Sequence, residues 1–242
     1  MAILEVHELV KRYPGFTLDG VSFTLERGRI MGLIGRNGAG KSTTLKSLFH
    51  LVQPDGGTIR MLGLAMPEQA RAIKQRVGYA GGAVDYYKRK KIKEITAVTR
   101  TFYENWDDAA YCRYCEAFAL DGEKTPLQLS EGMRVKYSLV LALSHGAELL
   151  ILDEPTSGLD PVSRAELLET FRFLRDRGVS ILFSSHITTD LEKCADDITY
   201  LKQGKQVASM PLQSFLLQHG GASLEEIMVQ YEKESLYEKL AE

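Results

Sequence analysis

A glycine-rich segment early in the chain constrains the fold more than any other feature. Residues Gly35–Ser42 match the pattern G-x-x-x-x-G-K-[ST], which binds nucleotide phosphates where a strand precedes it and a helix follows it. Ile30–Ile34 is almost continuously apolar, as expected of a strand that is covered on both faces, and Ser42–Val52 is predicted to be a helix. Strand, turn and helix in this order predict a phosphate-binding loop rather than a glycine-rich turn that matches by accident.

The residues of this segment suit the chemistry of a nucleoside triphosphate. Glycines allow the backbone to adopt positive φ and to approach closely, so that successive N–H groups surround phosphate oxygens. Lys41 supplies a point charge for the β- and γ-phosphates, the Ser42 hydroxyl is a suitable Mg²⁺ ligand, and the helix N-terminus adds a partial positive charge. The residues expected to bind nucleotide here are Gly35, Asn37, Gly38, Ala39, Gly40, Lys41, Ser42 and Thr43.

Two carboxylates follow a second apolar strand. Leu149–Leu152 is predicted to be a central strand, and Asp153 and Glu154 come directly after it. Because ligands of parallel sheets gather at the carboxyl ends of the strands, we expect this pair to lie near the phosphate loop. Asp153 is then expected to hold Mg²⁺ through its water shell, and Glu154 to polarise the water that attacks the phosphate. The alternative is that Asp-Glu-Pro simply ends the strand.

The remaining pattern predicts an α/β protein. Apolar and polar residues alternate in the first third of the chain, which is typical of half-buried antiparallel strands. After Gly81 the segments become longer and amphipathic, and beyond Tyr137 strand and helix alternate again, which indicates a mostly parallel sheet. We expect one domain over 1–242 with three parts: a nucleotide-binding core with an N-terminal antiparallel β subdomain (1–81 and 138–210), an inserted helical subdomain (82–137) and a C-terminal helical tail (211–242).

Composition excludes several classes of protein. The 30 basic and 32 acidic side chains give a net charge of −2, whereas nucleic-acid-binding proteins usually carry a basic excess, so no nucleic acid partner is expected. No apolar run approaches the about 18 residues of a membrane span, and the N-terminus lacks the layout of a secretion signal. The 3 cysteines are too few for a disulfide framework, which favours a cytosolic location. Cys112 and Cys115, without a second pair, make a poor zinc site.

One basic run leaves two alternatives open. Tyr86–Lys93 combines aromatic and basic residues. Such a run can bind nucleic acid or an anionic lipid surface. It is also typical of a solvated helix face, which is the plainer interpretation.

Further segments resemble the motifs of ATP-binding-cassette (ABC) ATPases. Leu129–Met133 resembles their LSGGQ signature, Ser157–Asp160 resembles their D-loop, and His186 resembles their switch histidine. Tyr13 lies where the family places an aromatic ring against adenine. The resemblance extends from about Ile3 to Ser209, and the motifs occur in the family's order.

The resemblance implies a P-loop NTPase core in which two ATPase units close around two ATP molecules with Mg²⁺. Ser130 and Gly132 would meet the γ-phosphate held by the opposite unit's Lys41. Asp160 would couple the two sites, and His186 would bind the γ-phosphate and help hold Glu154. Whether the pair is a homodimer or a heterodimer stays open.

The sequence departs from the family pattern at two places. In the signature, Glu131 replaces a glycine and Met133 replaces glutamine, and a carboxylate there would repel a γ-phosphate unless it points away. In the Q-loop, Gly82 falls near the usual glutamine, and Asp85 is a candidate substitute. Slow turnover or altered coupling is the resulting hypothesis.

These features together predict the ATP-binding subunit of an ABC transporter, an ATP hydrolase that drives a separate transmembrane subunit from the cytoplasmic face of the membrane. Phe102–Asp108 and Phe183–Ile187 resemble the small ATPases of ABC-2-type exporters, which implies export. Two alternatives are an ABC ATPase that acts in translation or DNA maintenance, and a binding module with an inactive site. The transported substrate stays open because the membrane subunit would choose it.

Overall fold

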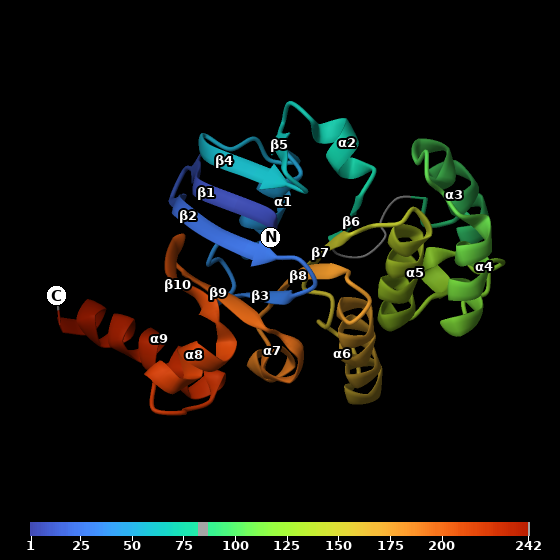
Figure 1. Cartoon of the computed structure of the whole chain (residues 1–242). Coiled ribbons are helices and arrows are strands. Elements are labelled where there is room, and N and C mark those ends of the chain that lie inside the picture. Colours follow the sequence, from blue (N-terminus) through green and yellow to red (C-terminus); the bar gives the residue numbers. More distant parts are fainter. Residues whose placement is uncertain (82–86, 242) are drawn as a thin grey trace.

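A single mixed sheet runs through the part of the protein that the computed structural model describes, residues 1–81 and 87–241 (Figure 1). Its strands follow the order β5-β4-β1-β2-β10-β9-β3-β8-β7-β6. The antiparallel strands occupy one end of the sheet and the parallel strands the other. The strands are β1 (Ala2–Tyr13), β2 (Phe16–Glu26), β3 (Ile30–Ile34), β4 (Gly56–Met61), β5 (Leu64–Met66), β6 (Val77–Gly81), β7 (Leu149–Asp153), β8 (Ser180–Ser185), β9 (Asp197–Lys202) and β10 (Lys205–Pro211).

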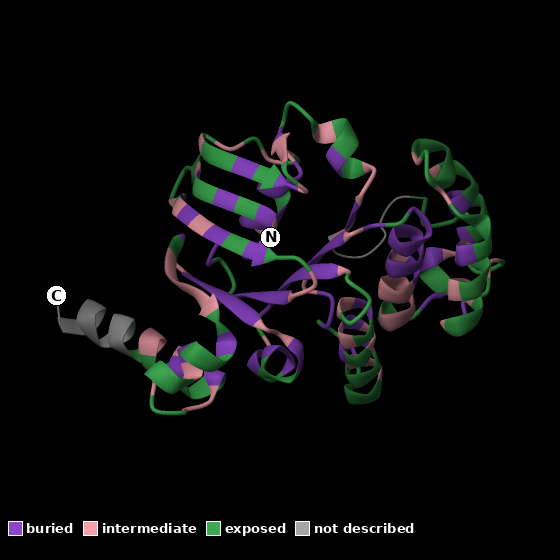
Figure 2. Ribbon diagram, viewed as in Figure 1, coloured by how far each residue is buried: buried purple, intermediate pink, exposed green. Residues whose placement is uncertain are grey.

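The parallel strands carry the continuous apolar runs because both of their faces are covered. β3 pairs in parallel with β8 and β9, and β7 pairs in parallel with β6 and β8. Along β7, Leu149 and Ile151 face one hydrophobic cluster, whereas Leu150 and Leu152 face another on the opposite side of the sheet. Both faces are thus covered, and Figure 2 shows these strands mostly buried while β1, β2 and β4 alternate.

Helices cover both faces of the parallel strands. α1 packs its residues Leu45 and Leu48 into the cluster that also holds the antiparallel strands. α6, α7, α8 and the start of α9 contribute to the cluster on the other face. The helices outside the helical block are α1 (Lys41–Leu48), α2 (Ala70–Lys74), α6 (Pro161–Arg175), α7 (Thr188–Cys194), α8 (Leu212–Gln218) and α9 (Leu224–Ala241).

A block of helices lies beside β6 and has a hydrophobic cluster of its own. Buried Tyr137 holds it together, because its hydroxyl donates to the Ile92 carbonyl at 3.0 Å and lies 2.9 Å from the Thr96 hydroxyl. The block consists of α3 (Ile92–Thr99), the 3₁₀ turns η1 (Arg100–Phe102) and η2 (Pro126–Gln128), α4 (Asp108–Ala117) and α5 (Glu131–Ser144). α5 belongs to both the helical block and the sheet domain, since Leu139 and Leu143 pack in the cluster that also holds α6, α7 and α8. The predicted boundary at 137 therefore falls inside a helix.

Two helices begin and end earlier than the sequence pattern predicts. α1 ends at Leu48 instead of Val52, because His50 takes a positive φ of 53° that a helix cannot continue through. α6 begins at Pro161 instead of Ser163, because Asp160 caps it and proline is well suited to a first helical position. Among the described residues, every helix is too short or too polar to cross a membrane.

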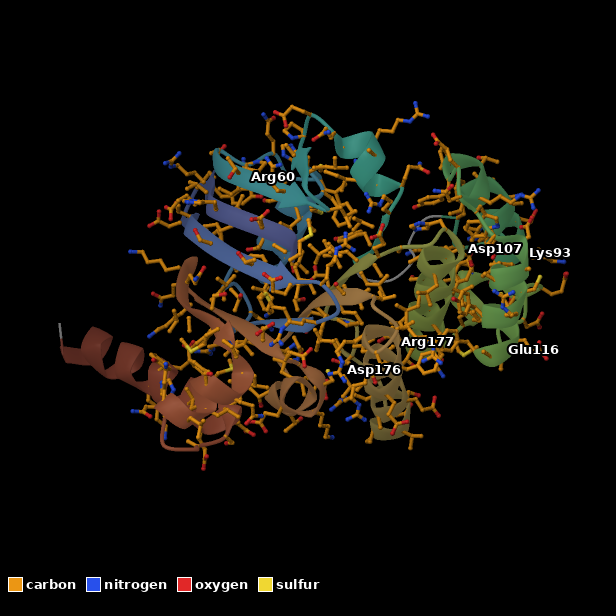
Figure 3. All side chains as sticks on the ribbon, in the orientation of Figure 1. Arg60, Lys93, Asp107, Glu116, Asp176 and Arg177 are labelled. Atoms are coloured by element: carbon orange, nitrogen blue, oxygen red, sulfur yellow. The ribbon has the colours of Figure 1, made fainter. Side chains whose placement is uncertain are left out.

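The basic run on the helical block is largely paired within the chain. Lys91 and Lys93 both contact Glu123, and Lys90 lies 3.6 Å from Glu94. Figure 3 shows Lys93 on the outer surface of the block. Most of the run lies in the turn before α3 and not on a helix face, and the ion pairs of Lys90, Lys91 and Lys93 leave it less open than a free cationic surface. Tyr86, at the start of the run, lies outside the described residues.

Candidate nucleotide-binding site

The phosphate loop connects the carboxyl end of β3 to α1. Gly35 has a φ of 151°, and a Cβ atom there would overlap the carbonyl oxygen of Leu201. Only glycine fits this close approach of the loop to β9, which explains the first glycine of the motif. Gly40 precedes α1 in the left-handed region, at a φ of 109°.

Lys41 is a buried cation at the centre of this loop. Its side chain is 5% exposed, and Nζ donates to the Gly35 carbonyl oxygen at 2.8 Å. The same Nζ lies 3.2 Å from Glu154 Oε1. The loop's own carbonyl and a carboxylate from another strand thus hold the ammonium group in place for a phosphate.

The acidic pair meets the phosphate loop as the sequence predicts. Ser42 Oγ donates to Asp153 Oδ1 at 3.1 Å, although the two residues are 111 positions apart. Ser184 Oγ donates to the same oxygen at 2.6 Å. A hydroxyl and a carboxylate side by side are oxygen donors of the kind that Mg²⁺ prefers, so these residues fit that ion.

Glu154 connects three parts of the site. It follows β7 with a positive φ of 51°, and its N–H donates to Ser184 Oγ at 2.9 Å. Its carboxylate Oε2 lies 2.7 Å from Nδ1 of His186, which follows β8. Lys41 and His186 therefore hold the two oxygens of one carboxylate at the mouth of the loop.

A cavity of about 530 Å³ lies over these residues. Three of its lining residues, Phe16, Arg36 and Ser157, are not among the site residues predicted from the sequence. Tyr13, the aromatic residue expected against adenine, does not line it: its ring centroid lies 6.5 Å from that of Phe16, with Lys11 above it at 5.5 Å. The lining residues are Phe16, Arg36, Asn37, Gly38, Gly40, Lys41, Ser42, Thr43, Glu154, Ser157 and His186.

A second group of predicted residues, Ser130, Gly132 and Asp160, lies at the starts of α5 and α6. Ser130 caps α5 and accepts a hydrogen bond from the Met133 N–H at 3.3 Å. Asp160 caps α6, and hydrogen bonds from the Ser163 hydroxyl and from the N–H groups of Ser163 and Val162 lower its pKa. Neither of these residues lines the cavity over Lys41, and neither does Gly132, beside α6.

Glu131 points toward its own chain's D-loop. A Cβ atom built at Gly158 would overlap Glu131 Oε2, so the carboxylate lies directly against this glycine. The Glu131 side chain is thus turned toward the D-loop of its own chain. Whether its carboxylate repels a γ-phosphate depends on this orientation. Gly82 and Asp85 of the Q-loop lie outside the described residues.

The profile of the ABC transporter family matches residues 18–157. The chain belongs to the ABC transporter family. It is 34% identical over 214 residues to the Nod factor export ATP-binding protein I of Burkholderia lata, covering 86% of this chain and 70% of that protein. It is 32% identical over 212 residues to the linearmycin resistance ATP-binding protein LnrL of Bacillus subtilis, covering 85% of this chain and 68% of that protein.

Solved structures agree with this family assignment. The ATP-binding subunit of an ABC transporter superimposes with a TM-score of 0.84 at 31% identity, covering 94% of this chain and 98% of that chain. The ATP-binding cassette MJ1267 in its ADP conformation superimposes with a TM-score of 0.76 at 20% identity, covering 88% of this chain and 92% of that chain, and shares the fold. The protein is an ATP-binding subunit of an ABC transporter and hydrolyses ATP.

Proposed function

We propose that this ABC transporter subunit hydrolyses MgATP between two cassettes to drive export through a separate membrane-spanning subunit, at the cytoplasmic face of the membrane. The observation that carries the proposal is the position of Glu154. Its carboxylate lies at the mouth of the phosphate loop, between the cation of Lys41 and the imidazole of His186. A base held this way beside a phosphate site is suited to orient a water molecule.

Different residues of the chain bind the phosphates, accept the proton from water and position the base during hydrolysis. The N–H groups of the loop and Lys41 bind the β- and γ-phosphates. Glu154 accepts a proton from the water that attacks the γ-phosphorus, the bond to the β-phosphate oxygen breaks, and ADP leaves. His186 binds the γ-phosphate and keeps the Glu154 carboxylate in position. Most of the rate enhancement comes from such positioning and charge.

Ser42 and Asp153 are the residues that would hold Mg²⁺. Their oxygen atoms lie 3.1 Å apart at the first turn of α1 and the end of β7. When bound, Mg²⁺ neutralises negative charge on the phosphate oxygens.

The proposal of a second cassette rests on the separation between the residues around Lys41 and those at the starts of α5 and α6. Ser130, Gly132 and Asp160 present helix N-termini and polar groups, but they do not line the cavity over Lys41. A second unit facing this one would bring its own signature helix to the γ-phosphate, where a helix N-terminus favours negative charge. Two units in antiparallel contact complete both sites.

Export is supported by the relatives. One is named for Nod factor export and another for linearmycin resistance, and both are ATP-binding proteins. Their names support movement of a substrate out of the cell. Among the described residues no helix crosses a membrane, so in this proposal a partner supplies the path.

The test compares MgATP hydrolysis by the wild type and by Glu154→Gln, with size measurement in ATP. We expect steady turnover by the wild type, and an inactive Glu154→Gln that dimerises in ATP. Glu166→Gln is the matched control, because Glu166 lies on α6 and pairs with Lys136 instead of the loop. Full turnover by Glu154→Gln would overturn the role of this carboxylate.

The transport step has a separate test. Co-expression with a candidate membrane subunit, followed by affinity purification, should recover both proteins and a higher ATPase rate. A cassette that is fully active and never co-purifies with any membrane protein would contradict the transporter role.

A further inference from the structure

One buried hydroxyl joins both members of the acidic pair. Ser184 is 0% exposed near the end of β8. Its Oγ donates to Asp153 Oδ1 at 2.6 Å and accepts a hydrogen bond from the Glu154 N–H at 2.9 Å. A serine hydroxyl has a single proton to donate. That proton is committed to Asp153, and the lone pair facing Glu154 is committed to the backbone.

The strand register explains why position 184 makes these contacts. β8 lies between β3 and β7, with Ser184 opposite Leu33 and Phe183 opposite Leu152. Ser184 therefore lies where the phosphate loop and the acidic pair leave the sheet. Two residues later, the same strand end carries His186, which contacts the Glu154 carboxylate.

The backbone at Glu154 needs such a partner. Its φ of 51° lies in the left-handed region, which residues other than glycine seldom occupy. Residues held in this region persist where their surroundings fix them. The bond from the Glu154 N–H to Ser184 is one such fixing contact, and it sets the direction in which the carboxylate leaves the chain.

We propose that Ser184 is a positioning residue for the catalytic site: its hydroxyl orients the Asp153 carboxylate toward the metal position and the Glu154 backbone toward the water. This inference rests on the roles proposed above for Asp153 and Glu154. Ser42 and Ser184 both donate to Asp153 Oδ1, but Ser42 is the residue that would ligate Mg²⁺. Ser184, buried behind the site, is the donor that keeps its bond to Asp153 throughout.

The first measurement is steady-state MgATP hydrolysis by Ser184→Ala. Removal of a group that orients a metal-binding carboxylate costs about 10- to 100-fold in activity, and we expect this loss in kcat with little change in the KM for ATP. Ser184→Thr keeps the hydroxyl and should restore most of the rate. Ser180→Ala is the matched control: Ser180 is 0% exposed on the same strand, but its Oγ accepts from the Gly28 N–H at the other end.

The second measurement does not depend on turnover. In the Glu154→Gln background, the melting temperature with ATP is followed as Mg²⁺ is titrated. Ser184→Ala should raise the Mg²⁺ concentration for half-maximal stabilisation by about 10-fold, and Ser180→Ala should leave it unchanged. If Ser184→Ala fails to fold, Ser184→Cys provides the comparison, because a thiol is a weaker donor of similar shape.

The outcomes separate the two proposals. If Glu154→Gln is inactive while Ser184→Ala matches Ser180→Ala in both kcat and Mg²⁺ dependence, the positioning role is overturned and the proposed function stands. If Glu154→Gln hydrolyses ATP at the full rate, the proposed function fails first. A lower kcat and a weaker Mg²⁺ response in Ser184→Ala, both restored by Ser184→Thr, support the inference.

Discussion

His186 Nδ1 lies 2.7 Å from Glu154 Oε2, joining the ends of two neighbouring parallel strands. His186 is about half exposed, so the pair opens onto the cavity over the phosphate loop. The carboxylate is tied on its other oxygen to Lys41, at 3.2 Å. We expect a phosphate bound to Lys41 to compete with Glu154 for the ammonium group, whereas the contact of Glu154 with His186 does not use that group. The imidazole is therefore the lasting support of this carboxylate.

Replacement of His186 by alanine tests that support. We expect His186→Ala to lower kcat by about 100-fold or more, because the site loses a polar group aimed at the reacting phosphate and the carboxylate loses its support. Single-turnover hydrolysis measures the effect separately from product release. His7→Ala is the control, since His7 is exposed on β1 away from the cavity. An unchanged single-turnover rate in His186→Ala would contradict the role.

The cavity lining predicts which aromatic residue supports nucleotide binding. Phe16 lines the cavity and packs near Gly40 of the loop, whereas Tyr13 does not line it. Phe16→Ala should weaken ATP binding by about 1 kcal/mol, the size of a typical aromatic contact, and Tyr13→Ala should weaken it less. Titration with a fluorescent ATP analogue gives both dissociation constants. A larger loss of ATP affinity for Tyr13→Ala than for Phe16→Ala would show that Tyr13 makes the adenine contact.

The predictions from sequence succeed where a contiguous motif or a general rule for parallel sheets determines the arrangement. The phosphate loop is a contiguous motif that can be recognised from its residues alone, although the close approach to Leu201 of β9 is what requires glycine at position 35. Asp153 and Glu154 could be placed beside Lys41 because strand ends of a parallel sheet meet at one edge. The sequence order of strand, loop and helix was sufficient for both.

Other features depend on register and side-chain direction, which a single sequence does not reveal. Ser184 reaches the acidic pair only because β8 lies between β3 and β7. Phe16 and Tyr13 flank the same turn, and the strand pairing decides which ring meets the loop. The sequence identifies Glu131 as a departure from the signature, but its direction toward Gly158 comes from the packing of α5 beside α6.

The contact between Glu131 and Gly158 gives a stability prediction. Gly158 has a φ of 74°, which costs about 1–2 kcal/mol for a residue with a Cβ atom, and that atom would also overlap the Glu131 carboxylate. Gly158→Ala should therefore destabilise the protein more than Gly63→Ala. Gly63 has a φ of 78° with nothing within 4 Å of a Cβ atom, so it reports the backbone cost alone.

A double variant measures how much of the stability loss in Gly158→Ala comes from the overlap with the Glu131 carboxylate. In chemical denaturation, adding Gly158→Ala to Glu131→Ala should cost only as much free energy of unfolding, relative to Glu131→Ala alone, as Gly63→Ala costs in the wild type, because the overlap is gone. Equal costs for Gly158→Ala and Gly63→Ala would contradict this extra cost and would show that the Glu131 carboxylate, at the end of an exposed side chain, moves aside.

The cysteines give a prediction about pH and thiol reactivity. Burial raises the pKa of Cys194 to about 12 from its ordinary value of 9.0, and its Sγ–H donates to the Asp190 carbonyl at 3.3 Å. Because the thiolate is the reactive form, Cys194 should resist Ellman's reagent in the native protein at pH 8, whereas exposed Cys112 should react at once. In denaturant all three thiols should react.

The raised pKa of Cys194 also determines the direction in which protein stability changes with pH. In the unfolded chain the Cys194 thiol loses its proton near its ordinary pKa, whereas in the folded protein it keeps that proton up to about pH 12. Unfolding therefore releases a proton between these values, and the contribution of this group to stability falls as pH rises above 9. Cys194→Ala should remove this part of the alkaline dependence measured by denaturant unfolding. A wild-type curve and a Cys194→Ala curve with equal slopes between pH 9 and pH 11 would contradict the shift.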